Sequence, residues 1–217
     1  LERLAREVTA EGRQIEARTV ESLTTMTLVD GPRELSLPGL EARRSCDFLR
    51  LAAPAEDPAP GAPVEISPPA EADAPDGRTQ VHLRPISPDN QIGGYNNDDR
   101  RLLDGDKVLY PLYLRAWRPG DRVLGAGDES ERLLREMFRR SAIPAWEREC
   151  WPVLTFAGQG AEEGKEAVVW SRGFGVSPAF AAGSSTCRAL EVREIAGDGR
   201  EIRRIEDWAA ATINEEV

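Results

Sequence analysis

The order of strand-like and helix-like patterns along the chain is the feature that most restricts its fold. Short stretches of apolar and polar residues, separated by turns rich in Pro and Gly, occupy most of the chain. Helical periodicity is clear only near the start and after residue 127, so strands and helices do not alternate regularly. A doubly wound sheet needs that alternation, because a helix connects neighbouring parallel strands. We therefore expect an α+β fold with mostly antiparallel sheets, a few helices and no doubly wound nucleotide-binding domain.

Several segments carry the pattern of short strands. In residues 34–53, apolar and polar residues alternate on both sides of a Pro-Gly turn, which is typical of strands in a hairpin. A Gly-Asp-Gly turn at residues 197–199 predicts another hairpin within residues 187–205. Further strands are expected in residues 79–87, 107–117, 152–158 and 166–176, the last two forming a hairpin.

Composition divides the chain into three regions. Residues 1–30 show helical spacing, and we expect them to be the end of a preceding domain. The chain begins with Leu1 rather than Met, so we expect a fragment or a processed form of a longer protein. Residues 31–110 form the second region, in which residues 53–78 are rich in Pro, Ala and acidic side chains and predict a linker or a long surface loop. Residues 111–217 form the third region.

The formal net charge of -10 argues against a uniformly basic surface for nucleic acid. The kind of cation is more informative than the sum, because Lys107 and Lys165 are the only lysines among the basic residues. A GC-rich genome would produce the same bias. The functional alternative is that some arginines bind phosphate through bidentate hydrogen bonds, for which lysine is not equivalent.

Residues 115–123, Arg-Ala-Trp-Arg-Pro-Gly-Asp-Arg-Val, place arginines around a tight turn. Pro119 presets its backbone φ and Gly120 permits a positive φ, so the turn is expected to be rigid. Asp121 is expected to brace the turn, because an aspartate there can accept hydrogen bonds from nearby N–H groups; the alternative is an ordinary turn residue. Arginines on such a turn lose less freedom when they bind a ligand. The arginines of this stretch are Arg115, Arg118 and Arg122.

Residues 128–143 have the pattern of an amphipathic helix. Asp128 and Glu131 are spaced as in a capping box, and Pro144 predicts that the helix ends before it. On a helical projection the apolar face consists of Leu133, Leu134, Met137 and Phe138, and the opposite face of Arg132, Arg135 and Arg139. The arginine face is either a ligand-binding surface or a solvated surface balanced by Glu131 and Glu136.

Metal and acid–base chemistry find little support. The three cysteines are widely spaced and form no Cys-x-x-Cys pair, so we expect reduced thiols and no zinc site. His82 is the only histidine, and we expect a packing or surface role for it. No apolar run is long enough to span a membrane, and the charged first residues are unlike a signal peptide.

One ordered set of motifs resembles a known family. In chain order, a series of segments reads YNND, LYLRAWRPGDRV, ERLLREMF, IPAWERECWPVL and VVWSRGFGV. In these segments the chain resembles the C-terminal domain of tRNA(Ile)-lysidine synthetase, TilS. The positions that carry the resemblance are Arg115, Arg118, Pro119, Gly120, Asp121, Gly125, Arg132, Arg135, Ile143, Pro144, Arg148, Pro152, Trp170 and Gly173. The chain departs from the family at Leu133 and Ala142, where lysines are frequent, and it carries arginines where the family prefers lysines.

The resemblance implies a PheT/TilS-like C-terminal fold in a cytoplasmic, ATP-dependent ligase that joins lysine to the wobble cytidine of tRNA(Ile), in a parent that is often a homodimer. It also implies that this region docks the tRNA body, above all the acceptor stem. ATP and Mg would bind a separate catalytic domain with an S-G-G-x-D-S motif that this sequence lacks, so we expect no catalytic residue, cofactor or metal here. The tRNA-binding residues that the resemblance implies are Arg115, Arg118, Arg132, Arg135 and Arg148. The turn adds Arg122 and the arginine face of the helix adds Arg139 to the predicted tRNA-binding residues.

Two other functions remain open at this point. In a protein-interaction module, the arginines would pair with the chain's own carboxylates and an apolar patch would bind the partner. An unrecognised enzyme is the third possibility, although the sequence contains no evident nucleophile–base pair. Trp117 and Trp146 are alternatives for core packing or for stacking on a terminal base.

Overall fold

The computed structural model describes residues 17–29, 31, 33–37, 39–54, 59–86, 101–124, 131–157 and 166–208. The chain divides into two compact units, the first made of residues up to Pro58 with Phe138–Arg148, and the second of Ala59–Met137 with the residues from Glu149 onward. These units do not coincide with the boundaries near residues 30 and 110 that composition suggests. Each unit is described by itself below.

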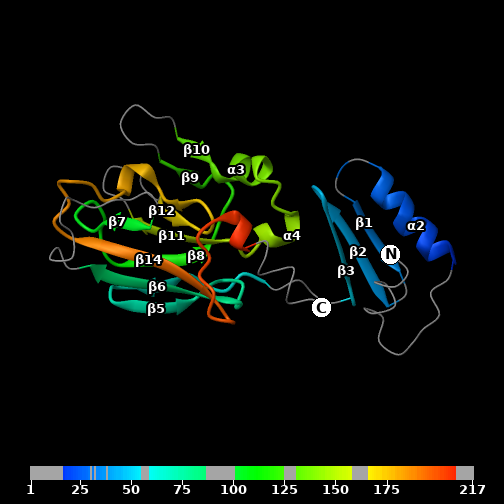
Figure 1. Ribbon diagram of the computed structural model, residues 1–217, viewed down its shortest axis with the longest axis horizontal. Helices are drawn as coiled ribbons and strands as arrows, with labels where there is room; N and C mark the ends of the chain where they lie inside the picture. Colours follow the sequence, from blue (N-terminus) through cyan, green and yellow to red (C-terminus); the bar gives the residue numbers. More distant parts are fainter. Residues whose placement is uncertain are drawn as a thin grey trace. The chain divides into compact units, whose positions relative to one another are not determined.

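The first unit contains a helix packed on a three-stranded antiparallel sheet (Figure 1). Helix α2 (Ala17–Leu28) lies along the sheet formed by β1 (Arg33–Leu37), β2 (Leu40–Ser45) and β3 (Phe48–Ala52). Leu23 and Met26 are one turn apart on α2 and pack on Leu40 and Ala42, so the apolar faces of the helix and the sheet bury one another. Gly39 has φ 78° where β1 turns into β2, which confirms the predicted strands and turn.

The second unit contains a larger sheet with the strand order β10-β9-β12-β11-β8-β4, to which β13 adds by pairing with β12. Most neighbours are antiparallel, whereas β9 and β12 run parallel. The predicted hairpin of β11 and β12 is present, with Val153 opposite Ser171. The strands are β4 (Val64–Ile66), β8 (Leu112–Ala116), β9 (Arg122–Val123), β10 (Arg132–Leu133), β11 (Pro152–Ala157), β12 (Glu166–Ser171) and β13 (Gly175–Val176).

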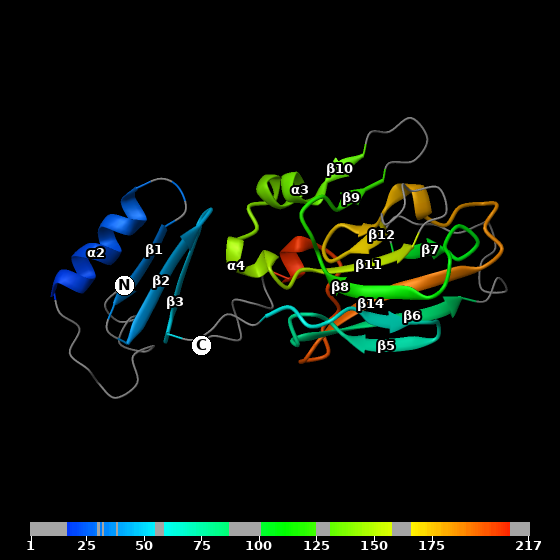
Figure 2. The same ribbon diagram turned by 180° about the vertical axis from the view of Figure 1, so that it is seen from behind.

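A four-stranded antiparallel sheet of the second unit has the order β5-β6-β14-β7, and Figure 2 shows it from behind. Its strands are β5 (Ala70–Asp73), β6 (Thr79–Ile86), β7 (Leu102–Asp104) and β14 (Ala189–Ala196). A short 3₁₀ helix, η2, spans Pro178–Phe180. Leu83 and Val192 of this sheet share one core cluster with Leu114 and Leu154 of the larger sheet. The expected α+β class with mostly antiparallel sheets is confirmed.

Residues 53–78 are not simply a linker. Strand β4 pairs with β8, placing Val64 opposite Leu114, and β5 pairs with β6. Ile66 is 5% exposed and joins the core. The strands of this segment are short, so few apolar side chains are enough to form them. The prolines at 68–69 lie between β4 and β5 and do not interrupt either strand.

The hairpin predicted around residues 197–199 is only partly formed. Strand β14 is present, and Gly199 lies in the turn with φ 85°. The returning segment pairs through a single bridge between Ile195 and Glu201. Arg203 and Arg204, which follow, are exposed to solvent and lie outside any strand.

The carboxylate of Glu201, in this returning segment, contacts three arginines. It accepts hydrogen bonds from Arg101, Arg193 and Arg203. Burial alone would raise the pKa of Glu201, but the hydrogen bonds from these arginines lower the pKa to about 2. The carboxylate therefore stabilises the fold above its ordinary pKa of 4.5, and this contribution is lost as the pH falls toward about 2.

Glu201→Gln is expected to flatten the acid dependence of stability. Because the amide does not titrate, the free energy of unfolding should fall less between about pH 6 and about pH 3 than in the unaltered protein. Urea unfolding at several pH values measures this fall. Glu206→Gln, at an exposed carboxylate of the same segment, is the control and should keep the original fall. Equal slopes in all three proteins would contradict the assignment.

Within the described residues, no helix is long and apolar enough to span a membrane. All three cysteines are free thiols, as expected: Cys46, Cys150 and Cys187. No group of three His, Cys, Asp or Glu side chains in the described part of the chain is arranged to hold a metal ion. The imidazole of His82 lies 3.3 Å from Glu71, between Nδ1 and Oε1, on the paired strands β6 and β5.

Candidate nucleic-acid interface

The Arg-Pro-Gly-Asp turn that follows β8 is closed by both the backbone and a side chain. The Asp121 N–H donates to the Arg118 carbonyl at 3.0 Å, and the Arg118 N–H donates to Asp121 Oδ2 at 2.7 Å. Gly120 has φ 103°, a value that strongly favours glycine. The Trp117 N–H donates to the Trp151 carbonyl at 2.8 Å, which ties the start of the turn to the neighbouring chain segment. We call residues 115–122 the corner.

Arg115 lies inside the corner rather than on its surface. Its side chain is 3% exposed, and its Nη1 and Nη2 atoms donate to the two carboxylate oxygens of Asp121, each at 2.9 Å. Its Nε donates to Glu166 Oε2 at 2.6 Å. Burial works against the charge, but Asp121 and Glu166 raise the pKa of Arg115.

These contacts change the role expected of Arg115. A direct phosphate contact requires an exposed guanidinium, whereas this one is enclosed and occupied by two carboxylates. Arg115 and Asp121 together hold the turn, Asp121 at the place where bracing was expected of it. The sequence pattern missed this difference because a strand that ends at a turn does not reveal which of its residues point inward.

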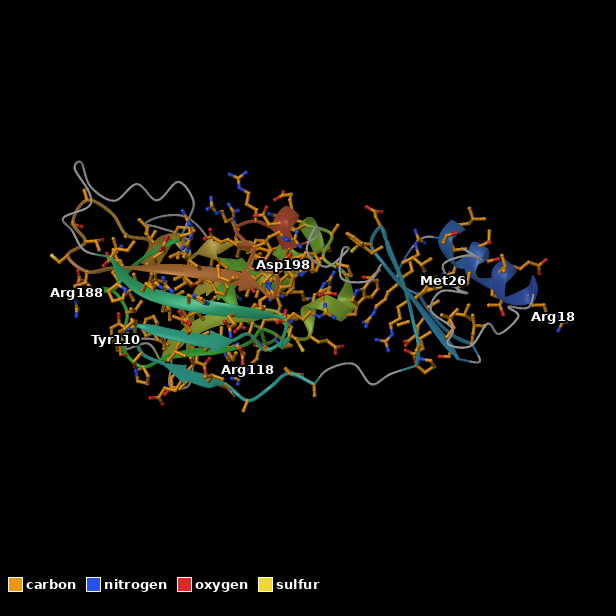
Figure 3. The ribbon with its side chains drawn as sticks, turned by 60° about the horizontal axis from the view of Figure 1, so that its bottom comes forward. Arg18, Met26, Tyr110, Arg118, Arg188 and Asp198 are labelled. Atoms are coloured by element: carbon orange, nitrogen blue, oxygen red, sulfur yellow. The ribbon has the colours of Figure 1, made fainter. Side chains whose placement is uncertain are left out.

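Arg118 and Arg122 are the exposed arginines of the corner (Figure 3 labels Arg118). The side chain of Arg118 is 55% exposed, and its Nη1 lies 3.6 Å from Glu166 Oε1. The side chain of Arg122 is 51% exposed, and its Nη1 lies 3.6 Å from Glu131 Oε2. Both distances exceed a normal N–H···O hydrogen bond, so each arginine has a nearby carboxylate without being tightly held by it.

Arg132 lies on a strand, which corrects the predicted helix. Residues 132–133 form β10, paired with β9, and α3 spans Leu134–Arg140. Asp128 lies outside the described residues. In the β9–β10 ribbon, Arg122 pairs with Leu133 and Arg132 pairs with Val123. Directly paired residues point to the same face, so Arg122 and Arg132 leave opposite faces of the ribbon.

Helix α3 keeps the predicted division into an apolar and a basic face. Leu134 and Phe138 are fully buried, whereas Arg135 and Arg139, one turn apart, are exposed. The Leu134 N–H donates to the Asp121 carbonyl at 3.0 Å, so the start of the helix is tied to the corner. In the described part of the chain, no carboxylate lies within ion-pair distance of Arg132, Arg135 or Arg139.

Arg148 belongs to the first unit, on the short helix α4 (Ala145–Arg148). Its Nε and Nη2 both donate to the Ile143 carbonyl, at 2.9 and 2.5 Å, and its Nη2 lies 4.0 Å from Cys46 Sγ. The Ala145 N–H donates to Ser45 Oγ at 3.0 Å. Arg148 is half-buried, and its hydrogen bonds to the Ile143 carbonyl hold the Ile-Pro segment in place. Contact between Arg148 and RNA stays a prediction.

Glu166 is the functional candidate that the sequence pattern missed. It begins strand β12 and reaches both the buried Arg115 and the exposed Arg118. Glu166 lies opposite Ala157 because β12 pairs with β11, and both strands are far from the corner in the sequence. No local signal marks such a residue. Trp117 and Trp146, the aromatic candidates, are both half-buried.

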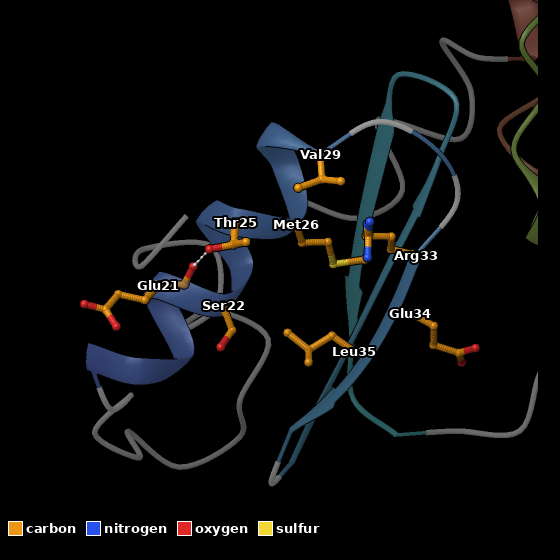
Figure 4. Close-up of a pocket in the computed structure, with 8 residues that line it drawn as sticks. All are labelled: Glu21, Ser22, Thr25, Met26, Val29, Arg33, Glu34 and Leu35. Carbon is orange, nitrogen blue, oxygen red and sulfur yellow. Dashed lines mark hydrogen bonds between the residues drawn. The ribbon is translucent and has the colours of Figure 1, made fainter.

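The first unit also has an open groove between α2 and β1 (Figure 4). Met26 and Leu35 lie between the helix and the strand, whereas Glu21 and Glu34 point away from this space. The remaining lining residues are Ser22, Thr25, Val29 and Arg33. The groove thus has an apolar floor of Met26 and Leu35, unlike the basic corner.

Comparisons with known proteins address the family. Residues 112–192 match the TilS substrate C-terminal domain. The tRNA(Ile)-lysidine synthase of Solibacter usitatus is 32% identical over 183 residues, which cover 82% of this chain and 38% of that protein. The tRNA(Ile)-lysidine synthase of Clostridium acetobutylicum is 26% identical over 113 residues, covering 52% of this chain and 23% of that protein. The chain thus spans well under half the length of these relatives.

A crystal structure of a TilS C-terminal domain is similar to 63% of this chain and 97% of its own chain, with 22% identity and a TM-score of 0.49. The segment that matches the family, residues 112–192, starts at β8, contains the corner and α3, and ends within β14. The tRNA(Ile)-lysidine synthase of Solibacter usitatus matches the chain over 183 residues, well beyond that segment. Residues 112–192 therefore belong to the TilS substrate C-terminal domain family, in a chain homologous to tRNA(Ile)-lysidine synthases.

Proposed function

We propose that this chain is the tRNA-docking part of a tRNA(Ile)-lysidine synthase. The parent enzyme would use ATP and Mg in a separate catalytic domain to attach lysine to the wobble cytidine of tRNA(Ile). The described residues would supply no catalytic group and would bind the body of the tRNA, including its acceptor stem. We place this activity in the cytoplasm.

One observation carries the proposal. Exposed arginines of the second unit without a described acidic partner, Arg132 and Arg135, adjoin a corner that the buried Arg115–Asp121 pair holds rigid. A-form RNA is recognised mainly through its shape, its phosphates and its 2′-hydroxyl groups, so fixed guanidinium groups suit it. A rigid support also reduces the entropy that is lost on binding.

The arginines of the corner itself support a second candidate, a module that binds another protein. Arg118 and Arg122 each have a carboxylate 3.6 Å away, so part of the arginine surface is neutralised by the chain itself. In that case binding would depend on apolar contact and would respond weakly to salt. Phosphate binding releases counterions and weakens steeply as salt rises.

Removing one exposed arginine is expected to weaken RNA binding without unfolding the protein. Arg135→Ala should reduce affinity for tRNA(Ile) by about three- to ten-fold at moderate salt and lower the salt slope by about one, and Arg118→Ala should act in the same direction. A fluorescence titration of the 217-residue chain with transcribed tRNA(Ile) at several salt concentrations measures both quantities.

Arg200→Ala is the matched control. Arg200 is exposed too, but its guanidinium pairs with Asp198 in the 197–199 turn. Its removal takes away one cationic charge outside the proposed surface and should change affinity less than Arg135→Ala. If the unaltered chain shows no salt-sensitive binding to tRNA(Ile), the docking proposal fails and the protein-binding candidate gains support.

A further inference from the structure

We infer that Glu166 is a specificity-determining residue, whose carboxylate competes with RNA phosphate for Arg118. The inference rests on the proposed docking function and adds a restraint to it. The surface would carry its own counter-charge, so that a polyanion gains the Arg118 contact only when it displaces Glu166. Such a residue lowers affinity for every nucleic acid and favours the one that also fits the rest of the surface.

The two oxygens of Glu166 have different tasks. Oε2 accepts hydrogen bonds from Arg115 Nε at 2.6 Å and from Thr155 Oγ1 at 3.1 Å, which fixes the carboxylate to the interior of the unit. Oε1 lies 3.6 Å from Arg118 Nη1. Burial alone would raise the pKa of Glu166, but hydrogen bonding to Arg115 lowers it. The group therefore stays negatively charged beside Arg118 at neutral pH.

The geometry makes the contact with Arg118 replaceable. Arg115 and Thr155 hold Glu166 in place whether or not Arg118 is near, so the carboxylate need not move when Arg118 turns toward a ligand. The 3.6 Å separation is longer than a hydrogen bond, and the Arg118 side chain is 55% exposed. Exposed pairs of this kind are weak, so their competition is worth at most about five-fold in affinity.

The second exposed arginine of the corner is arranged in the same way. Arg122 Nη1 lies 3.6 Å from Glu131 Oε2, and both side chains are about half exposed. Glu131 immediately precedes β10 and Glu166 begins β12, so two different segments each place one carboxylate beside one corner arginine. Arg135 and Arg139 on α3 have no such neighbour among the described carboxylates. The restraint is thus confined to the corner.

The test is a double-mutant cycle on RNA affinity. In Glu166→Gln, the amide oxygen can still accept from Arg115 and Thr155, while the negative charge beside Arg118 is lost. We expect two- to five-fold tighter binding of tRNA(Ile), about the worth of an exposed pair, and a larger gain for an unrelated structured RNA. In an Arg118→Ala background, Glu166→Gln should bring no such gain. Glu136→Gln, at an exposed carboxylate of α3, removes the same charge nearby and is the control.

Each outcome is decisive. Tighter binding that requires Arg118 and exceeds the effect of Glu136→Gln supports the inference. Equal gains from Glu166→Gln and Glu136→Gln, or a gain that survives Arg118→Ala, overturn it and leave the docking proposal intact. If the unaltered chain does not bind RNA, both fail. If Glu166→Gln lowers the thermal midpoint, Glu131→Gln tests the same mechanism at the more exposed Arg122–Glu131 pair. The gain in affinity from Glu131→Gln should vanish in an Arg122→Ala background.

Discussion

Arg172→Met is expected to lower the stability of the second unit by about 3–5 kcal/mol, or roughly 10 °C in its thermal midpoint. The side chain of Arg172 is 1% exposed, and its Nη2 lies 2.5 Å from Glu194 Oε1 and 2.6 Å from Asp76 Oδ2. Glu194 is fully buried and also accepts from Thr79 Oγ1 at 2.6 Å. Removing the guanidinium leaves that carboxylate in the interior with no cation beside it among the described residues.

The size of the effect comes from the unpaired charge, and a second substitution separates it from lost packing. Arg172 also lies 5.5 Å from the Trp151 ring centroid, so methionine removes a favourable contact as well as a charge. Adding Glu194→Gln to Arg172→Met removes the buried negative charge and should restore part of the stability. Packing loss alone would leave the double variant no more stable than the single one.

Arg188→Met provides the matched control for thermal unfolding. Arg188 pairs with Asp106 at 2.7 Å, but its side chain is 71% exposed. Water solvates both groups when the pair is broken, so the midpoint should stay close to that of the unaltered protein. If Arg172→Met shifted the midpoint no more than Arg188→Met does, the account of the buried network would be wrong.

The sequence predicted elements whose signals are local. The hairpin around Gly39 and the strands β6, β11 and β12 follow from alternation and turn residues, and they are present as expected. The apolar face of α3 followed from helical spacing, because Leu134 and Phe138 are four residues apart. Family resemblance, rather than periodicity, made the corner stand out from other Pro-Gly turns.

The errors occur where contacts between distant residues decide the structure. β4 and β5 are too short, and too close to prolines, to show an alternating pattern of apolar and polar residues. They form because β4 pairs with β8 and β5 pairs with β6. Arg132 lies in a strand rather than a helix because residues 132–133 pair with β9. The inward position of Arg115 depends on Glu166, which is 51 residues away in the chain. None of these partners can be found from the local sequence.

Asp121→Ala is expected to cost about 3 kcal/mol and to loosen the corner at the same time. The carboxylate accepts hydrogen bonds from Nη1 and Nη2 of Arg115, each at 2.9 Å, and from the Arg118 N–H at 2.7 Å. The Asp121 side chain is 9% exposed. Without it, the buried guanidinium keeps only Glu166 as an acidic partner among the described residues, and the turn loses its side-chain closure. Thermal unfolding measures the first effect and RNA affinity the second.

The structure supplies its own control for this prediction. Asp198 performs the same local task in an exposed turn, accepting from the Arg200 N–H at 2.9 Å and pairing with the Arg200 guanidinium. Asp198→Ala should therefore leave the thermal midpoint and RNA affinity nearly unchanged, since water replaces the lost contacts. If the docking surface depends on a rigid corner, Asp121→Ala will weaken RNA binding even at a temperature where the variant is fully folded. Affinity unchanged under those conditions would mean that Arg118 and the α3 arginines act without support from the turn.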